Sequence, residues 1–255
     1  MKTSERRHWE KFWGAERDPD EIYPDSPALM DRLEADGIAP GTRVLEVGAG
    51  SGRDAVALAR AGAHVTVVDY AENALEHVRV NAERAGVRVN RLRADGQCTP
   101  FPDGAFDLVI HQGLLEHFRD PLPLLGDNLR VLAPGGRLYC AVPQTFHLYT
   151  VFKHALIAAD RWFAGWETEF TPAGLDRVVE RAGFCAVGRF GSWMAPSLGY
   201  RVVRGGLNVC GLRLPMYPRG PRVLARLRRR FSEHMGSKPG AAWTFLVVGV
   251  VAEKP

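Results

Sequence analysis

Three glycines with an acid close by form the part of the sequence best suited to binding a ligand. An apolar stretch, Val44–Val47, leads into Gly48, Gly50 and Gly52, which are spaced two residues apart. Glycine adopts positive φ angles and has no Cβ, so a ligand can lie against the backbone of such a turn. The periodic apolar residues that follow predict a helix whose N-terminus faces the same place. Glu46 adds a negative charge, which favours a positively charged ligand and would repel a pyrophosphate.

A second acid lies where it could bind a nucleoside. The apolar stretch from His64 predicts a strand that ends at Asp69, about 20 residues after the glycine turn, where a carboxylate can accept both ribose hydroxyls. A third predicted strand leads to Asp95 and Gly96. A dinucleotide-binding turn would need its last glycine where Arg53 stands, so that class of ligand fits the turn poorly.

These motifs resemble those of the class I S-adenosyl-L-methionine (AdoMet)-dependent methyltransferases, whose cofactor carries an ammonium and a sulfonium group. The resemblance covers residues 43–142, since 101–111 is similar to the family's turn and fourth strand, and 132–142 to the entry to its fifth. It implies a methyltransferase with AdoMet as its cofactor. The cofactor-binding residues that it implies are Glu46, Gly48, Ala49, Gly50, Gly52, Asp69, Tyr70, Asp95, Gly96, Gln97, His111 and Gln112, with Tyr23 as a lid.

The same resemblance implies an α/β fold with a doubly wound, Rossmann-like, mostly parallel sheet of seven strands, whose antiparallel last strand lies between the fifth and the sixth. Apolar periodicity predicts strands near residues 43–47, 64–68, 88–92, 106–111, 137–142, 184–191 and 243–252. Helices are predicted near residues 53–61, 71–85, 120–132 and 171–182.

The remaining segments are expected to build the acceptor side of the site. We expect a helical cap over residues 1–40 and a methyltransferase domain over 41–255, with insertions at 143–170 and 192–240 at the carboxyl edge of the sheet, where such sheets bind ligands. Candidate acceptor-binding residues are His147, Tyr149, Trp166 and Arg201. A helix predicted at 5–13 has an aromatic face, for which packing on the core is the favoured interpretation. That face consists of His8, Trp9, Phe12 and Trp13.

Methyl transfer from a sulfonium chiefly needs an acceptor atom held in line with the methyl group and protected from water. His111 and His117, which follow the fourth strand, are the candidate catalytic residues, although contact of His111 and Gln112 with the methionine part of the cofactor is favoured over catalysis. Glu116 and His117 resemble half of the E-x-x-E-H metal motif of ubiquinone-pathway O-methyltransferases. Gly113 replaces the first glutamate and cannot bind a cation, so we predict no metal.

Methyltransferases that act on other classes of acceptor have sequence motifs that this chain lacks. Enzymes that methylate amino groups of DNA bases carry D/N-P-P-Y/F after the fourth strand, and protein-arginine enzymes need two glutamates near this loop. Here the corresponding stretch is His-Gln-Gly-Leu and the loop has one glutamate. A small-molecule acceptor is therefore expected, with no sequence-specific nucleic acid as partner.

The basic charge is concentrated in one segment. Residues 192–240 hold nine arginines and one lysine against one acid, which makes this segment +9 and the rest −5, for the total of +4. Within it, residues 221–231 predict an amphipathic helix, and residues 219–231 form a candidate interaction surface. This helix is either a solvated cover or a surface that recruits an anionic acceptor, an acidic carrier protein, anionic lipid or RNA, of which RNA is the least favoured because no aromatic residues interrupt the arginine run. A catalytically inactive AdoMet-binding protein acting through this surface is the alternative function.

The composition is that expected of a soluble cytoplasmic protein. The four cysteines are far apart and form no C-x-x-C pair, which suits a reducing compartment. The N-terminus lacks the apolar core of a signal peptide, and the longest apolar run, residues 245–252, is too short to span a bilayer.

Overall fold

A seven-stranded sheet forms the centre of the protein, in the order β3-β2-β1-β4-β5-β7-β6. The computed structural model describes residues 6–14, 28–159, 161–162, 166–193, 198–212, 214–215 and 240–255. The strands are β1 (Arg43–Val47), β2 (His64–Asp69), β3 (Asn90–Arg93), β4 (Phe106–Gln112), β5 (Leu132–Pro143), β6 (Cys185–Ser192) and β7 (Val247–Glu253). The pairs among β1 to β5 are parallel, and β7 runs antiparallel to both β5 and β6. This arrangement confirms the predicted doubly wound, mostly parallel sheet with its antiparallel last strand.

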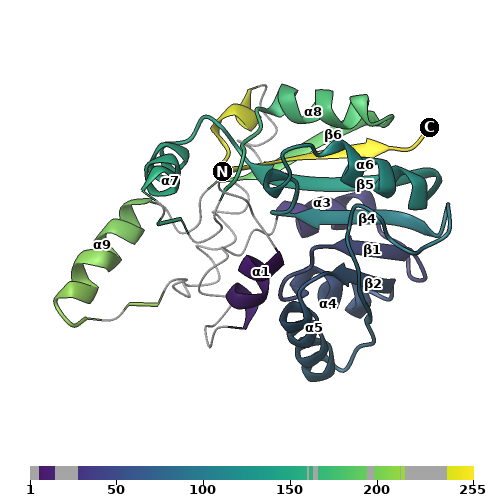
Figure 1. The fold of residues 1–255 in the computed structure, drawn as a ribbon, viewed down its shortest axis with the longest axis horizontal. Helices are drawn as coiled ribbons and strands as arrows, with labels where there is room; N and C mark the ends of the chain where they lie inside the picture. Colours follow the sequence, from purple (N-terminus) through teal and green to yellow (C-terminus); the bar gives the residue numbers. More distant parts are fainter. Residues whose placement is uncertain are drawn as a thin grey trace.

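Helices cover both faces of this sheet (Figure 1). The α-helices of the described residues are α1 (Arg6–Trp13), α3 (Ala28–Asp36), α4 (Arg53–Arg60), α5 (Glu72–Ala85), α6 (Leu122–Val131), α7 (Leu148–Ala158), α8 (Pro172–Arg181) and α9 (Leu198–Val209), and the short 3-10 helices are η1 (Leu115–His117) and η2 (Ala241–Thr244). Leu124 of α6 and Leu175 of α8 belong to a buried cluster on one face, whereas Leu29 of α3 and Leu58 of α4 belong to the cluster on the other. Alternating strand residues feed these two cores, which is why the strands could be recognised from apolar periodicity.

The structure adjusts two predicted element boundaries. The last strand begins at Val247 rather than at residue 243, because Ala241–Thr244 form the 3-10 helix η2. Strand β5 begins at Leu132, five residues before the expected start at 137, and it pairs with Phe106 before the register shifts. Neither change moves the carboxyl ends of the parallel strands, so the predicted position of the site is unaffected.

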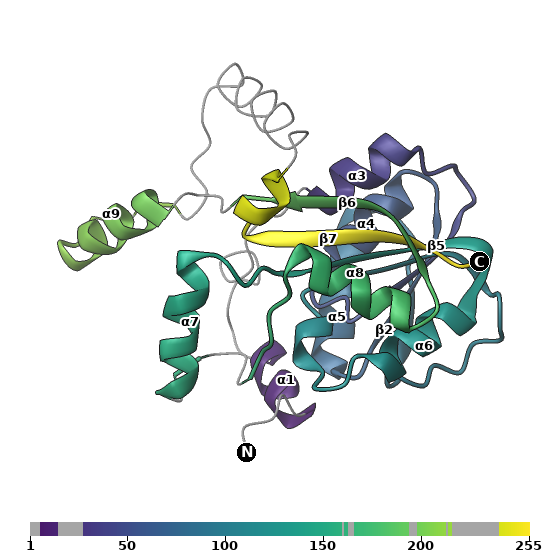
Figure 2. The same ribbon diagram turned by 90° about the horizontal axis from the view of Figure 1, so that it is seen from above.

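The segment after β5 lies at the carboxyl edge of the sheet. Figure 1 and Figure 2 show α1 and α7 beyond this edge, with α9 farther from the sheet. A bridge between Gln144 and Phe170 joins the two ends of this segment, and Thr145 N donates to the Phe170 carbonyl. The basic helix predicted at residues 221–231 and the candidate surface at 219–231 lie outside the described residues. Among the helices that are described, none combines the length and apolar character needed to cross a bilayer.

Candidate active site

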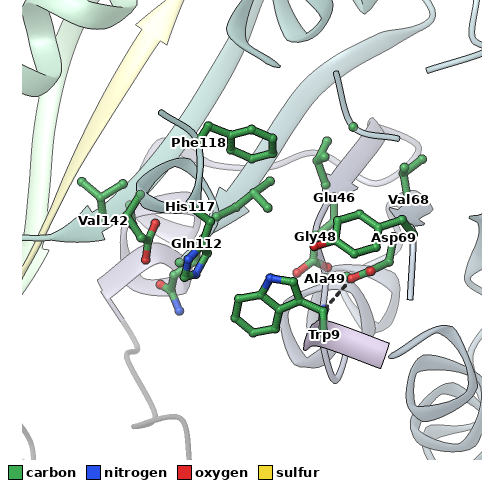
Figure 3. Close-up of a pocket in the computed structure, with 18 of the residues that line it drawn as sticks. Trp9, Glu46, Gly48, Ala49, Val68, Asp69, Gln112, His117, Phe118 and Val142 are labelled. Atoms are coloured by element: carbon green, nitrogen blue, oxygen red, sulfur yellow. Dashed lines mark hydrogen bonds between the residues drawn. The ribbon is translucent and has the colours of Figure 1, made fainter. Parts of the chain in front are cut away.

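A cavity of about 880 Å³ opens at the carboxyl edge of the sheet. Its walls come from the loop after β1, the ends of β2 and β4, helix α1, and the segment around α7. Figure 3 shows the carboxylates of Glu46 and Asp69 on one side, Gln112 and His117 on the other, and the indole of Trp9 between them. The volume is in the range of small-molecule sites and leaves room for two ligands side by side.

The glycine turn is packed tightly on its protein side. Gly48, Gly50 and Gly52 have φ angles of 66°, 53° and 69°, which favour glycine. A Cβ on Gly50 would lie 2.7 Å from the ring of Trp13, and one on Gly52 would lie 2.7 Å from the Val78 side chain. Gly48 and Gly50 line the cavity, whereas Gly52 is the residue before α4 and packs against α5. The three glycines are therefore needed for the positive φ angles of the turn and for its close packing, as well as for ligand space.

Two carboxyls lie on the cofactor side of the cavity, that of Glu46 buried and that of Asp69 partly buried. Glu46 is 6% exposed, and its Oε2 has no hydrogen-bond partner among the described residues. Desolvation, followed by repulsion from Asp54, raises the Glu46 pKa well above its ordinary value. Burial raises the pKa of Asp69 to about 6, although this carboxylate accepts the backbone N–H of Ala71 at 2.8 Å and of Gly50 at 3.4 Å. A ligand with cationic groups and hydroxyls would supply what both carboxyls lack.

Ten of the residues expected to bind the cofactor line this cavity. They are Glu46, Gly48, Ala49, Gly50, Asp69, Tyr70, Asp95, Gly96, Gln97 and Gln112. His111 is 1% exposed within β4, apart from the described residues that line the cavity, and burial lowers its pKa to about 4. Tyr23 lies outside the described residues.

The other end of the cavity carries polar side chains from three segments. Glu116 and His117 belong to η1 after β4, Lys153 to α7, and Trp162 and Glu167 to the chain that follows. Lys153 Nζ donates to Glu167 Oε2 at 2.8 Å, and Trp162 Nε1 donates to Glu167 Oε1 at 2.9 Å. This end of the cavity, here called the acceptor end, is where a second ligand would meet the first.

The candidate catalytic and acceptor residues are only partly brought together. His117 lines the cavity, its ring contacts Trp9 at 4.7 Å between centroids, and burial lowers its pKa. Trp166 lines a smaller neighbouring cavity, where the Arg119 guanidinium lies 4.3 Å from its ring centroid. His147 lies just before α7, apart from the described lining of either cavity. Tyr149 and Arg201 lie in α7 and α9, but their side chains are outside the described set.

Sequence reasoning missed the residues that complete the two ends. Trp9 and Trp13 of α1 line the cavity, although packing on the core was the favoured interpretation; both also pack, at 8% and 9% exposed. Lys153, Trp162 and Glu167 gave no signal, because a lysine or glutamate outside a motif is usually a surface residue. Among the described residues, no group of three or more His, Cys, Asp or Glu side chains is placed to hold a metal ion.

A mostly parallel sheet of this order, with a glycine turn and two acids at its carboxyl edge, is the arrangement typical of nucleoside-binding α/β proteins. Comparisons with known proteins agree. Residues 45–140 match the family model described as a methyltransferase domain. The chain is 32% identical over 146 residues to the ubiquinone biosynthesis O-methyltransferase of Xanthomonas campestris pv. campestris (strain B100), covering 55% of this chain and 61% of that protein. It thus spans about three fifths of the length of this curated relative.

Solved structures share the fold at low sequence identity. A SAM-dependent methyltransferase from Aquifex aeolicus superposes with a TM-score of 0.59 at 15% identity, covering 96% of this chain and 98% of that one. The cyclase SpnF superposes with a TM-score of 0.57 at 21% identity, covering 89% and 80%. The family match identifies residues 45–140 as a methyltransferase domain, the fold is that of solved SAM-dependent methyltransferases, and AdoMet is the cofactor that these similarities imply. The similarity to a cyclase shows that the fold by itself does not define the reaction.

Proposed function

We propose that the protein transfers the methyl group of AdoMet to a small-molecule acceptor, with an oxygen atom as nucleophile. The observation that carries this proposal is one cavity that joins the cofactor side, with Glu46 and Asp69, to the acceptor end, with Glu116 and Lys153. A relative at 32% identity is named an O-methyltransferase, which supports oxygen as the receiving atom. In-line transfer needs both ligands in one enclosed space, and this cavity supplies it.

The chain's own residues fit the cofactor. Asp69 has lone pairs left for the two ribose hydroxyls, and Glu46 offers an unpartnered, buried carboxyl oxygen to the methionine ammonium. Asp95, Gly96 and Gln97 line the adenine side that the family resemblance implies. When bound, AdoMet supplies a methyl group already activated by its sulfonium.

Helix α1 supports a closing role for the N-terminal segment. Trp9 and Trp13 line the cavity, and Glu10 accepts from the backbone N–H of Glu72 at the start of α5. This contact supports residues 1–40 as a cap on a methyltransferase domain at 41–255, with the insertion at 143–170 forming acceptor-end walls. Such a cap would keep water from the sulfonium during transfer.

The finer identity of the acceptor is a separate part of the proposal. An anionic, lipid-like or carrier-bound acceptor would depend on the basic residues 219–231, which lie outside the described part of the chain. Glu116 and Glu167 line the acceptor end, and Glu169 lies behind them, 2.8 Å from the Lys153 ammonium that it shares with Glu167. Any negative charge of the acceptor is therefore expected to lie away from the reacting atom.

The test combines cofactor binding with turnover. Calorimetry should show binding of AdoMet and of S-adenosylhomocysteine, with no measurable binding of NAD. Transfer of radiolabelled methyl to members of a metabolite panel should then identify acceptors. Binding of AdoMet without transfer to any acceptor would favour the inactive cofactor-binding alternative, and failure to bind AdoMet would refute both functions.

A further inference from the structure

A buried ion cluster lies at the acceptor end. The Lys153 ammonium, whose side chain is 1% exposed, lies 2.8 Å from Glu167 Oε2 and 2.8 Å from Glu169 Oε1. The side chains of both glutamates are 7% exposed. A buried ammonium is tolerated only where carboxylates compensate its charge, and here two carboxylates do so. The positive charge of Lys153 is thereby already balanced within the cluster.

Glu116 is the third carboxyl of this region and lacks a comparable partner. It is 3% exposed and lines the cavity, and its Oε2 has no hydrogen-bond partner among the described residues. Its position is fixed by the backbone, because Thr168 N donates to the Glu116 carbonyl at 2.9 Å. A buried, unpartnered carboxyl oxygen at the wall of a ligand cavity indicates a partner that arrives with the ligand.

The surroundings of Glu116 make it a proton-accepting group suited to neutral pH. Desolvation raises the pKa of Glu116 to about 8, and repulsion from Glu167 and Glu169 adds to this effect, whereas Lys153 lowers the pKa. Other charged or titratable groups nearby are His117, whose pKa burial lowers, Cys140 of β5, whose thiol pKa burial raises, Arg119 in the cavity wall and His154, which pairs with Glu169. A general base is most effective when its pKa lies near the working pH.

We propose that Glu116 is the general base of the methyl transfer, and that the acceptor is an aromatic hydroxyl with no negative charge near the reacting oxygen. This inference rests on the proposed methyltransferase function. As the oxygen lone pair forms the new O–CH₃ bond, the C–S bond breaks and its electron pair returns to sulfur, which becomes a neutral thioether. The hydroxyl proton passes to the ionised Glu116 carboxylate and then to solvent, so charge and atoms balance.

The lining of the acceptor end supports this class of acceptor. The indole rings of Trp9 and Trp162, together with Leu246 and Val247, provide an aromatic and apolar surface that suits a flat ring. A phenol has a pKa of about 10, so proton transfer to a base with a pKa of about 8 is only about 100-fold unfavourable, against roughly a million-fold for an ordinary glutamate. An anionic group beside the glutamates would be repelled.

The closing experiment compares Glu116→Gln with Glu83→Gln, a control on the exposed face of α5, where Glu83 pairs with Arg79. Ortho-ethylphenol, 2-(2-aminoethyl)phenol and ortho-hydroxyphenylacetate serve as probes, because they share one phenol and differ in the charge that lies beside its hydroxyl. We expect wild type and Glu83→Gln to methylate the neutral and cationic probes, with a kcat/KM at least about tenfold lower for the anionic one. Glu116→Gln should lose about 100-fold or more in kcat and keep its AdoMet affinity.

The pH profile separates a base from a structural residue. For wild type, kcat/KM should rise about tenfold per pH unit up to about pH 8 and then level off, whereas the residual activity of Glu116→Gln should lack this rise. Infrared difference spectra between wild type and Glu116→Gln should show a protonated carboxyl that disappears with a midpoint near pH 8, without any acceptor.

Several outcomes would overturn the inference. A Glu116→Gln protein that keeps its kcat, or a carboxyl that titrates near the ordinary glutamate value, would exclude Glu116 as the base. Preference for the anionic probe, or wild-type turnover of panel metabolites but of none of the three probes, would overturn the acceptor class. AdoMet binding with no turnover of any compound would refute the proposed methyltransferase function itself. That result differs from those that refute only Glu116 as the base or the aromatic acceptor.

Discussion

Replacing Asp69 with alanine should weaken AdoMet binding. In the protein without cofactor, the same change should remove the pH-dependent loss of unfolding free energy that the partly buried Asp69 carboxylate causes. The Asp69 carboxylate accepts the backbone N–H of Ala71 at 2.8 Å and of Gly50 at 3.4 Å, and the backbone N–H of Tyr70 also donates to it. The two oxygens are the acceptors that we assign to the ribose hydroxyls, which would compete with the weaker of these backbone contacts. Losing both acceptors leaves polar groups unmatched in the complex, which we estimate at about 2–3 kcal/mol, or roughly 30- to 150-fold in AdoMet affinity.

In the protein without cofactor, Asp69→Ala should instead increase stability relative to wild type at neutral pH. Burial raises the folded-state pKa of Asp69 to about 6, above the ordinary value of 3.8. The unfolded chain therefore ionises first, so the favourable contribution of this group is present at acidic pH and is lost as the pH rises through 6. From the two pKa values, the loss amounts to about 3 kcal/mol of unfolding free energy between about pH 4 and pH 7.

Denaturant unfolding of the free protein at several pH values, together with calorimetric AdoMet titration, measures both effects. Asp103→Ala, in which an exposed carboxylate is removed, is the control and should change neither. Compared with wild type, Asp69→Ala should gain relative stability as the pH rises from 4 to 7. Unchanged AdoMet affinity would refute the ribose assignment, and a stability difference that is flat across this pH range would refute the burial argument.

Three further predictions concern separate parts of the site. Gly50→Ala should destabilise the protein by about 1–3 kcal/mol more than Gly86→Ala, because both positions have positive φ but only at Gly50 would the new Cβ meet a ring, that of Trp13; denaturant unfolding of both variants tests this difference. A chelator should leave methyl transfer intact, and loss of turnover that magnesium or zinc restores would contradict this expectation. Replacing the arginines of residues 219–231 with glutamine should raise the KM for an anionic acceptor and flatten its salt dependence, and equal kinetics at low and high ionic strength would refute recruitment.

The sheet and the cofactor side could be predicted because their signals are local. Strands β1 and β4 have nearly continuous apolar runs, and the glycines and acids that bind a nucleoside lie where those strands end. The parallel topology then brings Glu46, Asp69 and Asp95 to one edge without further information. The sequence did not show that Gly50 is also needed for packing. Trp13 of α1 lies against Gly50, and these two residues are far apart in the sequence.

The aromatic face of α1 shows a limit of periodicity. Spacing indicated that one face of the helix is apolar, and the structure confirms that Trp9 and Trp13 are buried. Periodicity does not tell which surface the face covers. Here the indole rings pack against protein on one side and line the ligand cavity on the other, so packing and ligand contact are not alternatives for these two residues.

The acceptor end depends on charges that meet only in three dimensions. Glu116 follows a parallel strand and could be placed at the sheet edge from sequence, whereas Lys153 and Glu167 lie in a segment without a motif. Their contact makes the chain's own ammonium the compensating charge for two of the three glutamates, and it leaves Glu116 as the group with a raised pKa. Replacing Lys153 would remove the ammonium that Glu167 and Glu169 share and would raise the Glu116 pKa further, so the lysine that stabilises this wall also lowers the proton affinity of Glu116.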